Sequence, residues 1–493
     1  MRRFLVRPRL HCVLVASCIG LALPATAATT ATTASTAAGA ATPASAVAQT
    51  LRVDYFHTGN AREERFALER VVLEPLAWPG NPGKTLDDTN LGKYFFEVID
   101  RSSRRVLYSR GFASIYGEWE TTGEATEIDR TFSESLRFPR PEGPVQIVLR
   151  KRDKANDFHE IWSLIVDPAD MLVDASHPPS AGELLALQRS GDPADKLDFL
   201  ILGDGYTAAE RGKCESDARR LMAILFAVEP FQSRRNDLNV WGLCPAAAES
   251  GISRPSSGIH RRSPVGSTYD AFRSERYILT FDNRAFRDLA SQAPYEVVEI
   301  LANGKTYGGG GIFGQFSTVA ADSLWAPYVF VHEFGHHLAA LADEYYTSDV
   351  AYAPAADRAE PWEPNVTALL DPANLKWKSL MEPGTPLPTP WGKEAYEARS
   401  REIQAERRKI RAEKRPESEM DALFTRQRDE EEKRLAAEAF AGKVGAFEGA
   451  NYEAKGYYRP AADCIMFTRD RAPFCPVCQH GIDRVIDLYA KGK

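Results

Sequence analysis

The stretch that most constrains this chain covers residues 329–346 and reads VFVHEFGHHLAALADEYY. Its many apolar positions predict a buried helix. Because residues four apart share one face of a helix, His332 and His336 can direct their imidazoles at a single ion, with Glu333 beside it. The alternative is a core helix with two satisfied histidines. Three of the nine histidines fall within residues 332–337, and this clustering favours a metal site.

Zinc is the ion that this HExxH spacing predicts. Zinc held by neutral imidazoles lowers the pKa of a water molecule toward neutrality, and a nearby carboxylate can then accept the proton. Glu333 is therefore the candidate general base.

Two imidazoles leave a tetrahedral zinc ion one protein ligand short. In a straight helix Asp343 points within about 20° of His332, yet it lies roughly 10 Å along the axis from His336. Either the helix ends or bends after His336, or the third ligand comes from elsewhere. The segment 337–342 contains no glycine to help such a turn. Asp343 is the candidate, and its rivals are Glu344, Glu448 and Asp463.

Residues 1–27 have the pattern of an export signal, with four arginines before an apolar run and Ala-Thr-Ala at its end. The run is too short for a stable membrane span. A lipoprotein signal with Cys18 is a weaker reading, because the apolar run continues past this cysteine. Residues 28–50, mostly Ala and Thr, predict a flexible tether.

About 440 residues then remain, which predicts two domains with a boundary in the Pro-, Ser- and Gly-rich segment 170–195. Short alternating runs at 51–56, 94–99, 105–109, 145–149 and 160–166 predict a β-sandwich over residues 51–175. Its role is accessory: a spacer, a docking surface for substrate or a brace.

Residues 190–493 alternate between apolar strands and helical patterns, which predicts an α/β catalytic domain. Strands are expected at 196–202, 238–243, 277–281 and 297–301, and a capping box at Thr207 and Glu210 opens a helix. The glycine-rich segment 307–317 is either an edge strand that receives an extended peptide or a flexible loop.

The charge-dense run 393–438 predicts an inserted, solvated helix or a helix pair broken at Pro416. Its acidic residues roughly balance its basic ones, and the formal net charge of the chain is −7. Nucleic acid is therefore not an expected partner.

Five cysteines follow the export signal, and export favours disulfides. We expect Cys214 to pair with Cys244, and Cys464 to pair with Cys475 or Cys478. The remaining thiol is then free or bound to metal.

Several long motifs of the chain resemble the bacterial IgA-peptidase family of zinc metallopeptidases. In the first domain the resemblance rests on residues 52–59, 90–97, 108–112 and 116–121. In the second it rests on residues 332–345, 445–449, 464–466 and 474–478.

The resemblance implies an α+β multidomain protein, with an N-terminal β-sandwich followed by a metzincin-like α/β zinc-peptidase domain. It implies Zn²⁺ on His332 and His336, with Asp343 as the third ligand and Glu333 as the base. Met466 is implied to lie in the turn below the metal.

The sequence thus predicts a secreted zinc endopeptidase that acts on protein or peptide substrates. Tyr457 or Tyr458 is either an oxyanion-stabilising group or part of the core. The competing hypothesis is a secreted surface protein that binds a glycan or a protein and has a structural or inactive zinc site. A free coordination position distinguishes the enzyme from this binder. Oligomeric state and cleavage preference stay open.

Overall fold

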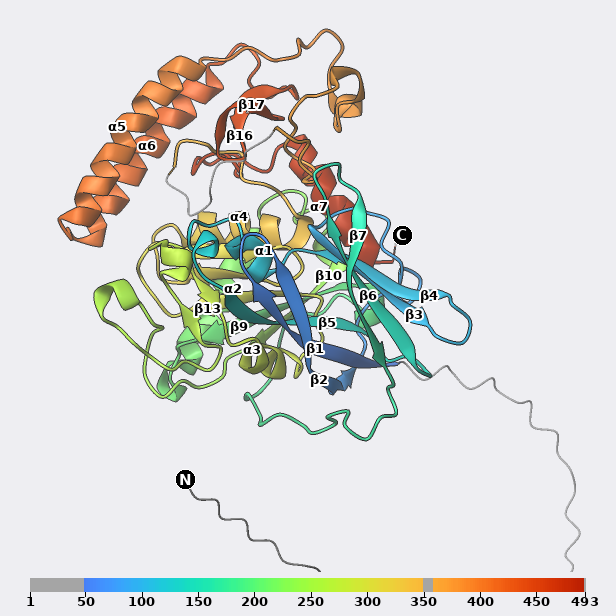
Figure 1. Cartoon of the computed structure of the whole chain (residues 1–493). Coiled ribbons are helices and arrows are strands. Elements are labelled where there is room, and N and C mark those ends of the chain that lie inside the picture. The colour runs from blue at the N-terminus through green and yellow to red at the C-terminus, as the bar shows by residue number, and fades with distance from the viewer. Residues whose placement is uncertain (1–47, 349–357, 492–493) are drawn as a thin grey trace, which may run out of the picture. The chain divides into compact units, whose positions relative to one another are not determined.

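The computed structural model describes residues 48–348 and 358–491 (Figure 1). The predicted export signal at 1–27 and nearly all of the predicted tether lie outside these described residues. Within the described ranges, no helix has both the length and the apolar character needed to cross a bilayer.

The N-terminal part is rich in strands, as the alternating runs predict. Its two sheets are antiparallel and have the orders β2-β1-β5 and β4-β3-β6-β7. The short helix α1 (Ile115–Trp119) follows β4. The strands are β1 (Gln49–Gly59), β2 (Glu64–Ala77), β3 (Tyr94–Asp100), β4 (Val106–Phe112), β5 (Arg130–Pro139), β6 (Val145–Arg152) and β7 (Phe158–Val166).

These two sheets share one hydrophobic core. Apolar residues from both belong to a single buried cluster, including Val53 of β1, Phe96 of β3 and Leu149 of β6. Side chains alternate between the two faces of a strand, so the period-2 pattern gives each sheet one apolar face. Burying these two faces against each other holds the N-terminal strands together.

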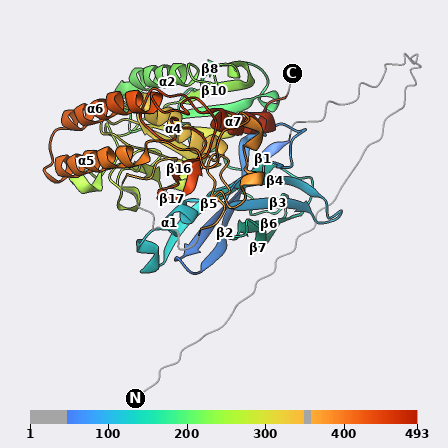
Figure 2. The same ribbon diagram turned by 90° about the horizontal axis from the view of Figure 1, so that it is seen from above.

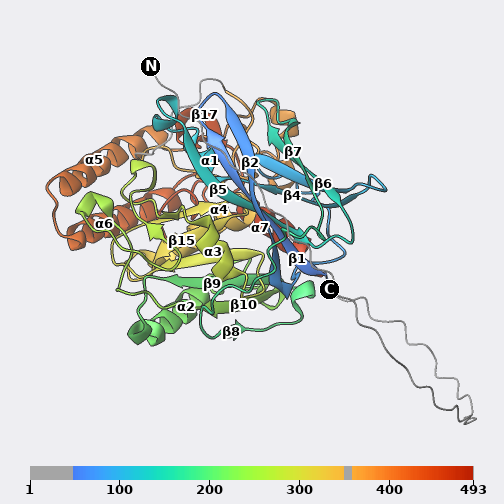
Figure 3. The same cartoon turned by 60° about the horizontal axis from the view of Figure 1, so that its bottom comes forward.

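The second part contains a six-stranded mixed sheet of order β14-β15-β13-β9-β10-β8 (Figure 3). Its four central strands are parallel, and β14 and β8 run antiparallel at the two edges. The strands are β8 (Leu185–Gln188), β9 (Leu197–Asp204), β10 (Leu238–Leu243), β13 (Val297–Ala302), β14 (Gly309–Ile312) and β15 (Phe316–Ala320).

Helices cover both faces of this sheet, which explains why β9 is buried along its whole length. Phe199 and Ile201 of β9 pack into the same cluster as residues of α2, α4 and α7. Leu200 and Leu202 point to the other face and share a cluster with residues of α3. The helices are α2 (Arg211–Leu225), α3 (Asn283–Ala290), α4 (Ala326–Ala339) and α7 (Pro476–Tyr489).

The predicted strand at 277–281 differs from the structure. Only β12 (Leu279–Thr280) forms there, and it pairs with β11 (Ser267–Thr268) outside the main sheet. Tyr277 forms only an isolated bridge with Gly309 of β14, and Leu279 is buried by packing against the sheet.

The charged run forms the predicted helix pair, α5 (Lys393–Ala412) and α6 (Glu417–Ala436), with the break just before Pro416. The two helices lie side by side at one edge of the fold (Figure 2). Their few apolar residues form an inward stripe, so that Ile403, Leu423 and Phe424 join the main core. The hairpin of β16 (Phe447–Ala450) and β17 (Glu453–Arg459) follows.

Candidate active site

Helix α4 carries the HExxH motif. It begins with Pro327 in its first turn, where the missing N–H of proline costs no hydrogen bond. His332 and His336 lie one turn apart on the same face, and their Nε2 atoms are 3.1 Å apart.

The helix ends directly after the motif. Ala340 adopts the left-handed conformation, with φ 55° and ψ 31°, and its N–H still bonds to the carbonyl of His336. A helix commonly ends in this way, although glycine is the usual residue at such a position. The reversal brings Asp343 back along the helix, so the structure realises the predicted alternative in which the helix stops early.

Asp343 meets both histidines. Its Oδ1 lies 3.1 Å from Nε2 of His332 and 3.2 Å from Nε2 of His336. Tetrahedral ligands about 2.0–2.1 Å from a zinc ion are roughly 3.3 Å apart, so the triangle of these three atoms has a suitable size.

The orientation of the rings suits a cation at the centre of this triangle. Nδ1 of His332 lies 2.9 Å from the carbonyl oxygen of Ile465, and Nδ1 of His336 bonds to the carbonyl of Leu341. Each Nδ1 therefore carries the proton, and each Nε2 presents a lone pair. The buried Oδ1 of Asp343 has no hydrogen-bond partner among the described residues. Three acceptors facing one point repel each other unless a cation lies between them, so these residues fit a metal ion.

A tyrosine and an asparagine hold Asp343, the candidate third ligand, in place. The hydroxyl of Tyr452 donates to Oδ2 of Asp343 at 2.5 Å. Asn365 clamps the segment before it, since its side chain accepts from the N–H of Ala342 and donates to the Ala342 carbonyl. The sequence reading missed both residues. Asn365 belongs to an Asn-Val-Thr triplet that suggests glycosylation instead, and no pattern links Tyr452 to Asp343 across more than a hundred residues.

Replacing Tyr452 with phenylalanine should weaken metal binding by about 10- to 100-fold, because outer hydrogen bonds of this kind orient the ligand. Competition with a chelator of known affinity measures the change. Tyr458→Phe is the matched control, since this tyrosine lies in β17 and does not touch Asp343. Equal affinities for the two variants would contradict the assigned role of Tyr452.

Glu333 lies one residue after His332 and lines the same cleft. Burial raises the pKa of its carboxyl group; the two imidazoles oppose this effect and the negative Asp343 adds to it. A raised pKa makes the carboxylate a better proton acceptor near neutral pH.

The methionine turn lies below the helix. The N–H of Phe467 bonds to the carbonyl of Cys464 at 2.8 Å, which closes a tight turn around the buried Met466. A Cβ atom at Gly335 would lie 3.2 Å from the sulfur of Met466, so the turn packs closely against α4 between the two histidines.

The rivals of Asp343 have other partners. Glu344 points away into a cluster of cysteines. Glu448 pairs with Lys393 at 2.7 Å. Asp463 accepts from the hydroxyl of Thr468 at 2.6 Å.

His337, the third histidine of the motif, is a core residue. Its Nε2 accepts from the N–H of Val298 at 3.0 Å, and its Nδ1 lies 3.1 Å from the carbonyl oxygen of Ile312. Burial lowers the pKa of His337 to about 3, so the ring is neutral. It joins α4 to strands β13 and β14 instead of binding metal.

The triangle of His332, His336 and Asp343 opens into a cleft with a volume of about 770 Å³. Tyr345 and Tyr452 are among the described residues that line it, whereas Tyr457 and Tyr458 are not. Arg276 also lines the cleft and donates to the hydroxyl of Tyr345 at 3.1 Å. The cleft is bounded by Glu333 and His336 of α4, Gly309 and Gly311 of β14, and Lys93 and Arg152 of the N-terminal part.

The glycine run forms the edge strand β14 and not a flexible loop. Its glycines are required because α4 packs directly on the strand. A Cβ atom at Gly311 would clash with the backbone oxygen of Glu333 and lie 2.9 Å from Cβ of His336. One at Gly309 would clash with the side chain of Val329.

Gly311→Ala should therefore destabilise the fold by about 2 kcal/mol or more, because the strand and the helix backbone cannot both stay in place. Thermal unfolding measures this loss. The control is Gly212→Ala in α2, where a Cβ atom meets nothing within 4 Å and alanine favours the helix. A Gly311 variant as stable as this control would show that α4 and β14 do not need this close packing.

The cysteines follow the prediction in part. Cys214 and Cys244 form the predicted disulfide. The predicted pairing of Cys464 with Cys475 or Cys478 is wrong, since all three are buried free thiols. Their side chains form a cluster with Glu344, and no two of them are joined by a disulfide.

An HExxH helix beside an open cleft is typical of metallopeptidases. The family model described as IgA Peptidase M64 matches residues 185–486, and the model described as Peptidase M64 N-terminus matches residues 44–163. The chain therefore belongs to the IgA peptidase M64 family, and the resemblance noted from its motifs is confirmed. A search of curated proteins found no match.

Proposed function

We propose that this chain is a secreted zinc-dependent endopeptidase. The observation that carries the proposal is the convergence of two imidazole nitrogens and one unsatisfied carboxylate oxygen at the edge of a cleft, beside Glu333. Among the described residues this group offers three ligands, which leaves a position for water or substrate and favours an enzyme over a binding protein with a closed site.

In this proposal His332, His336 and Asp343 hold the zinc ion. Bound zinc would act as a Lewis acid toward water and the peptide carbonyl. Glu333 takes a proton from the attacking water on its carboxylate and delivers it to the nitrogen of the leaving amine. Ile465 and Leu341 keep the two rings in the required tautomer through their carbonyl oxygens, and Tyr452 holds the carboxylate of Asp343.

The cleft supports an extended peptide as the substrate. Its volume is within the range of pockets that enclose substantial ligands. The edge strand β14 lies along it. Gly309 of this strand already bonds to Arg276 and Ile278, and an extended chain can add to the edge beyond Gly309 through backbone hydrogen bonds.

We assign residues 51–175 to an N-terminal β-sandwich and residues 190–493 to a metzincin-like catalytic domain with the insertion 393–438. The shared core of the two N-terminal sheets supports the first assignment. The methionine turn beneath the HExxH helix supports the second.

Digestion of a broad peptide library tests the function. We expect cleavage at internal bonds, loss of cleavage after treatment with a chelator, and recovery when zinc is added back. Release of terminal residues alone would contradict an endopeptidase. Cleavage that persists in metal-free protein would contradict zinc dependence.

A further inference from the structure

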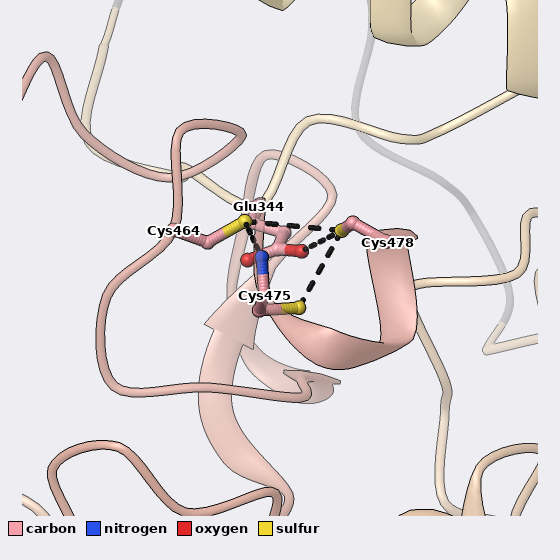
Figure 4. A group of neighbouring side chains, drawn as sticks. All are labelled: Glu344, Cys464, Cys475 and Cys478. Carbon is pink, nitrogen blue, oxygen red and sulfur yellow. Dashed lines mark hydrogen bonds between the residues drawn. The ribbon is translucent and has the colours of Figure 1, made fainter. Parts of the chain in front are cut away.

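A second group of ligand-type side chains lies on the other side of Asp343. Glu344 directs its carboxylate toward three thiols, which come from the methionine turn and from the start of α7 (Figure 4). Sγ of Cys478 lies 3.5 Å from Sγ of Cys475 and 3.8 Å from Sγ of Cys464. The same sulfur lies 3.3 Å from Oε1 of Glu344.

These distances suit four ligands around one ion. In a tetrahedral zinc site with Zn–S near 2.3 Å, two sulfurs are roughly 3.8 Å apart, and a sulfur and a carboxylate oxygen are roughly 3.5 Å apart. The four ligand atoms all lie within 4.8 Å of one another. A disulfide between any two of the sulfurs would instead need a separation of about 2.05 Å.

The surroundings favour a cation held by anionic ligands. All four residues are buried, and Oε2 of Glu344 has no hydrogen-bond partner among the described residues. Cys475 is the N-cap residue of α7 and Cys478 lies in its first turn, where the helix dipole stabilises thiolates. The N–H of Cys475 points at Sγ of Cys464, 3.3 Å away. A buried carboxylate among three sulfurs is costly without such an ion.

We propose that Glu344, Cys464, Cys475 and Cys478 bind a second zinc ion. Four protein ligands close its coordination, so the site is structural and does not hydrolyse peptides. Binding would release the thiol protons to solvent and keep the sulfurs from oxidation. The proposal rests on the geometry of this cluster and not on the proposed peptidase activity.

The second site would brace the first. Asp343 and Glu344 are neighbours, and the N–H of Glu344 bonds to the carbonyl of Met466 at 2.9 Å. Cys464 lies one residue before Ile465, whose carbonyl oxygen orients His332. One ion would therefore fix both the segment of the third ligand and the turn beneath α4.

Zinc counting by mass spectrometry on the full chain tests this proposal, with protein purified with a mild reductant and without chelator. We expect two zinc ions per chain in the wild type. The variants His332→Ala/His336→Ala and Cys464→Ser/Cys478→Ser should each retain one. Cys214→Ser/Cys244→Ser is the matched control, because it removes two cysteines elsewhere and should keep both ions.

X-ray absorption at the zinc edge identifies the ligands that remain. In the inactive double-histidine variant, the retained zinc should have sulfur neighbours at about 2.3 Å. This readout needs neither activity nor a folded cysteine variant. Absence of zinc from the double-histidine variant would overturn the proposal, as would a disulfide between Cys464 and Cys475 or Cys478 in the native protein. Failure of the proposed peptidase function would show instead as a two-zinc protein that cleaves no peptide.

Discussion

Glutamine in place of Glu333 is expected to remove peptide hydrolysis and leave the bound metal untouched. The turnover number should fall by a factor of about 10²–10⁴, the usual contribution of a general base, since an amide cannot accept the proton of the attacking water. The side chains of glutamate and glutamine have nearly the same shape, so the packing of α4 on β14 is preserved. Turnover of a cleaved peptide and the zinc content of the same sample together measure the effect.

Glu142→Gln is the control for this variant. The same chemical change is then made at an exposed turn between β5 and β6, far along the chain from α4. We expect it to match the wild type in turnover and zinc content. A Glu333→Gln enzyme that keeps its turnover would refute the proposed role of this carboxylate.

Alanine at Asp343 should abolish both tight metal binding at the histidines and activity. Loss of a residue that hydrogen-bonds to a ligand lowers metal affinity by about 10- to 100-fold, so loss of the ligand itself should lower the affinity by more than about 100-fold. Asp343→Asn should lie between alanine and the wild type, because the amide still offers an oxygen atom but no charge. Chelator competition, compared with the His332→Ala/His336→Ala variant that lacks the histidine site, isolates the affinity of that site.

Glu448→Ala is the control for Asp343→Ala, because it also removes one carboxylate but at a residue that is not an assigned ligand. Glu448 is another ligand candidate by sequence, yet it pairs with Lys393 and should leave zinc binding unchanged. Should Asp343→Ala bind zinc as tightly as Glu448→Ala does, the third ligand would have to be sought elsewhere.

The helix and its two histidines could be foreseen because the information is local. A spacing of four residues places both rings on one face in any helix, whatever surrounds it. The strand-rich N-terminal part could be predicted for the same reason, since an alternating pattern requires only one buried and one exposed face of each strand. The break of the charged run at Pro416 follows from proline chemistry alone.

The return of Asp343 could not be decided from sequence. The reversal depends on Ala340 in a left-handed conformation that alanine rarely adopts, and contacts distant in sequence hold it there. The side chain of Asn365 accepts a hydrogen bond from the N–H of Ala342, and the carbonyl of Met466 accepts one from the N–H of Glu344. Helix propensity at these positions would instead continue the helix.

The pairing of the last three cysteines was mispredicted for a related reason. An export signal favours disulfides in general, but it does not indicate that the carboxylate of Glu344, more than a hundred residues away in sequence, lies beside these thiols. The position of Glu344 among the sulfurs appears only once the methionine turn is packed under α4.

Asp343 belongs to the histidine cluster and its neighbour Glu344 to the cysteine cluster, so the length of the connector after His336 sets which of them faces which cluster. Deletion of one residue there would bring Glu344 to the imidazoles and Tyr345 to the thiols, whereas insertion of one residue would bring Ala342 to the imidazoles and Asp343 to the thiols. Loop engineering near this cleft therefore has to conserve residue count in the connector as strictly as it conserves chemistry.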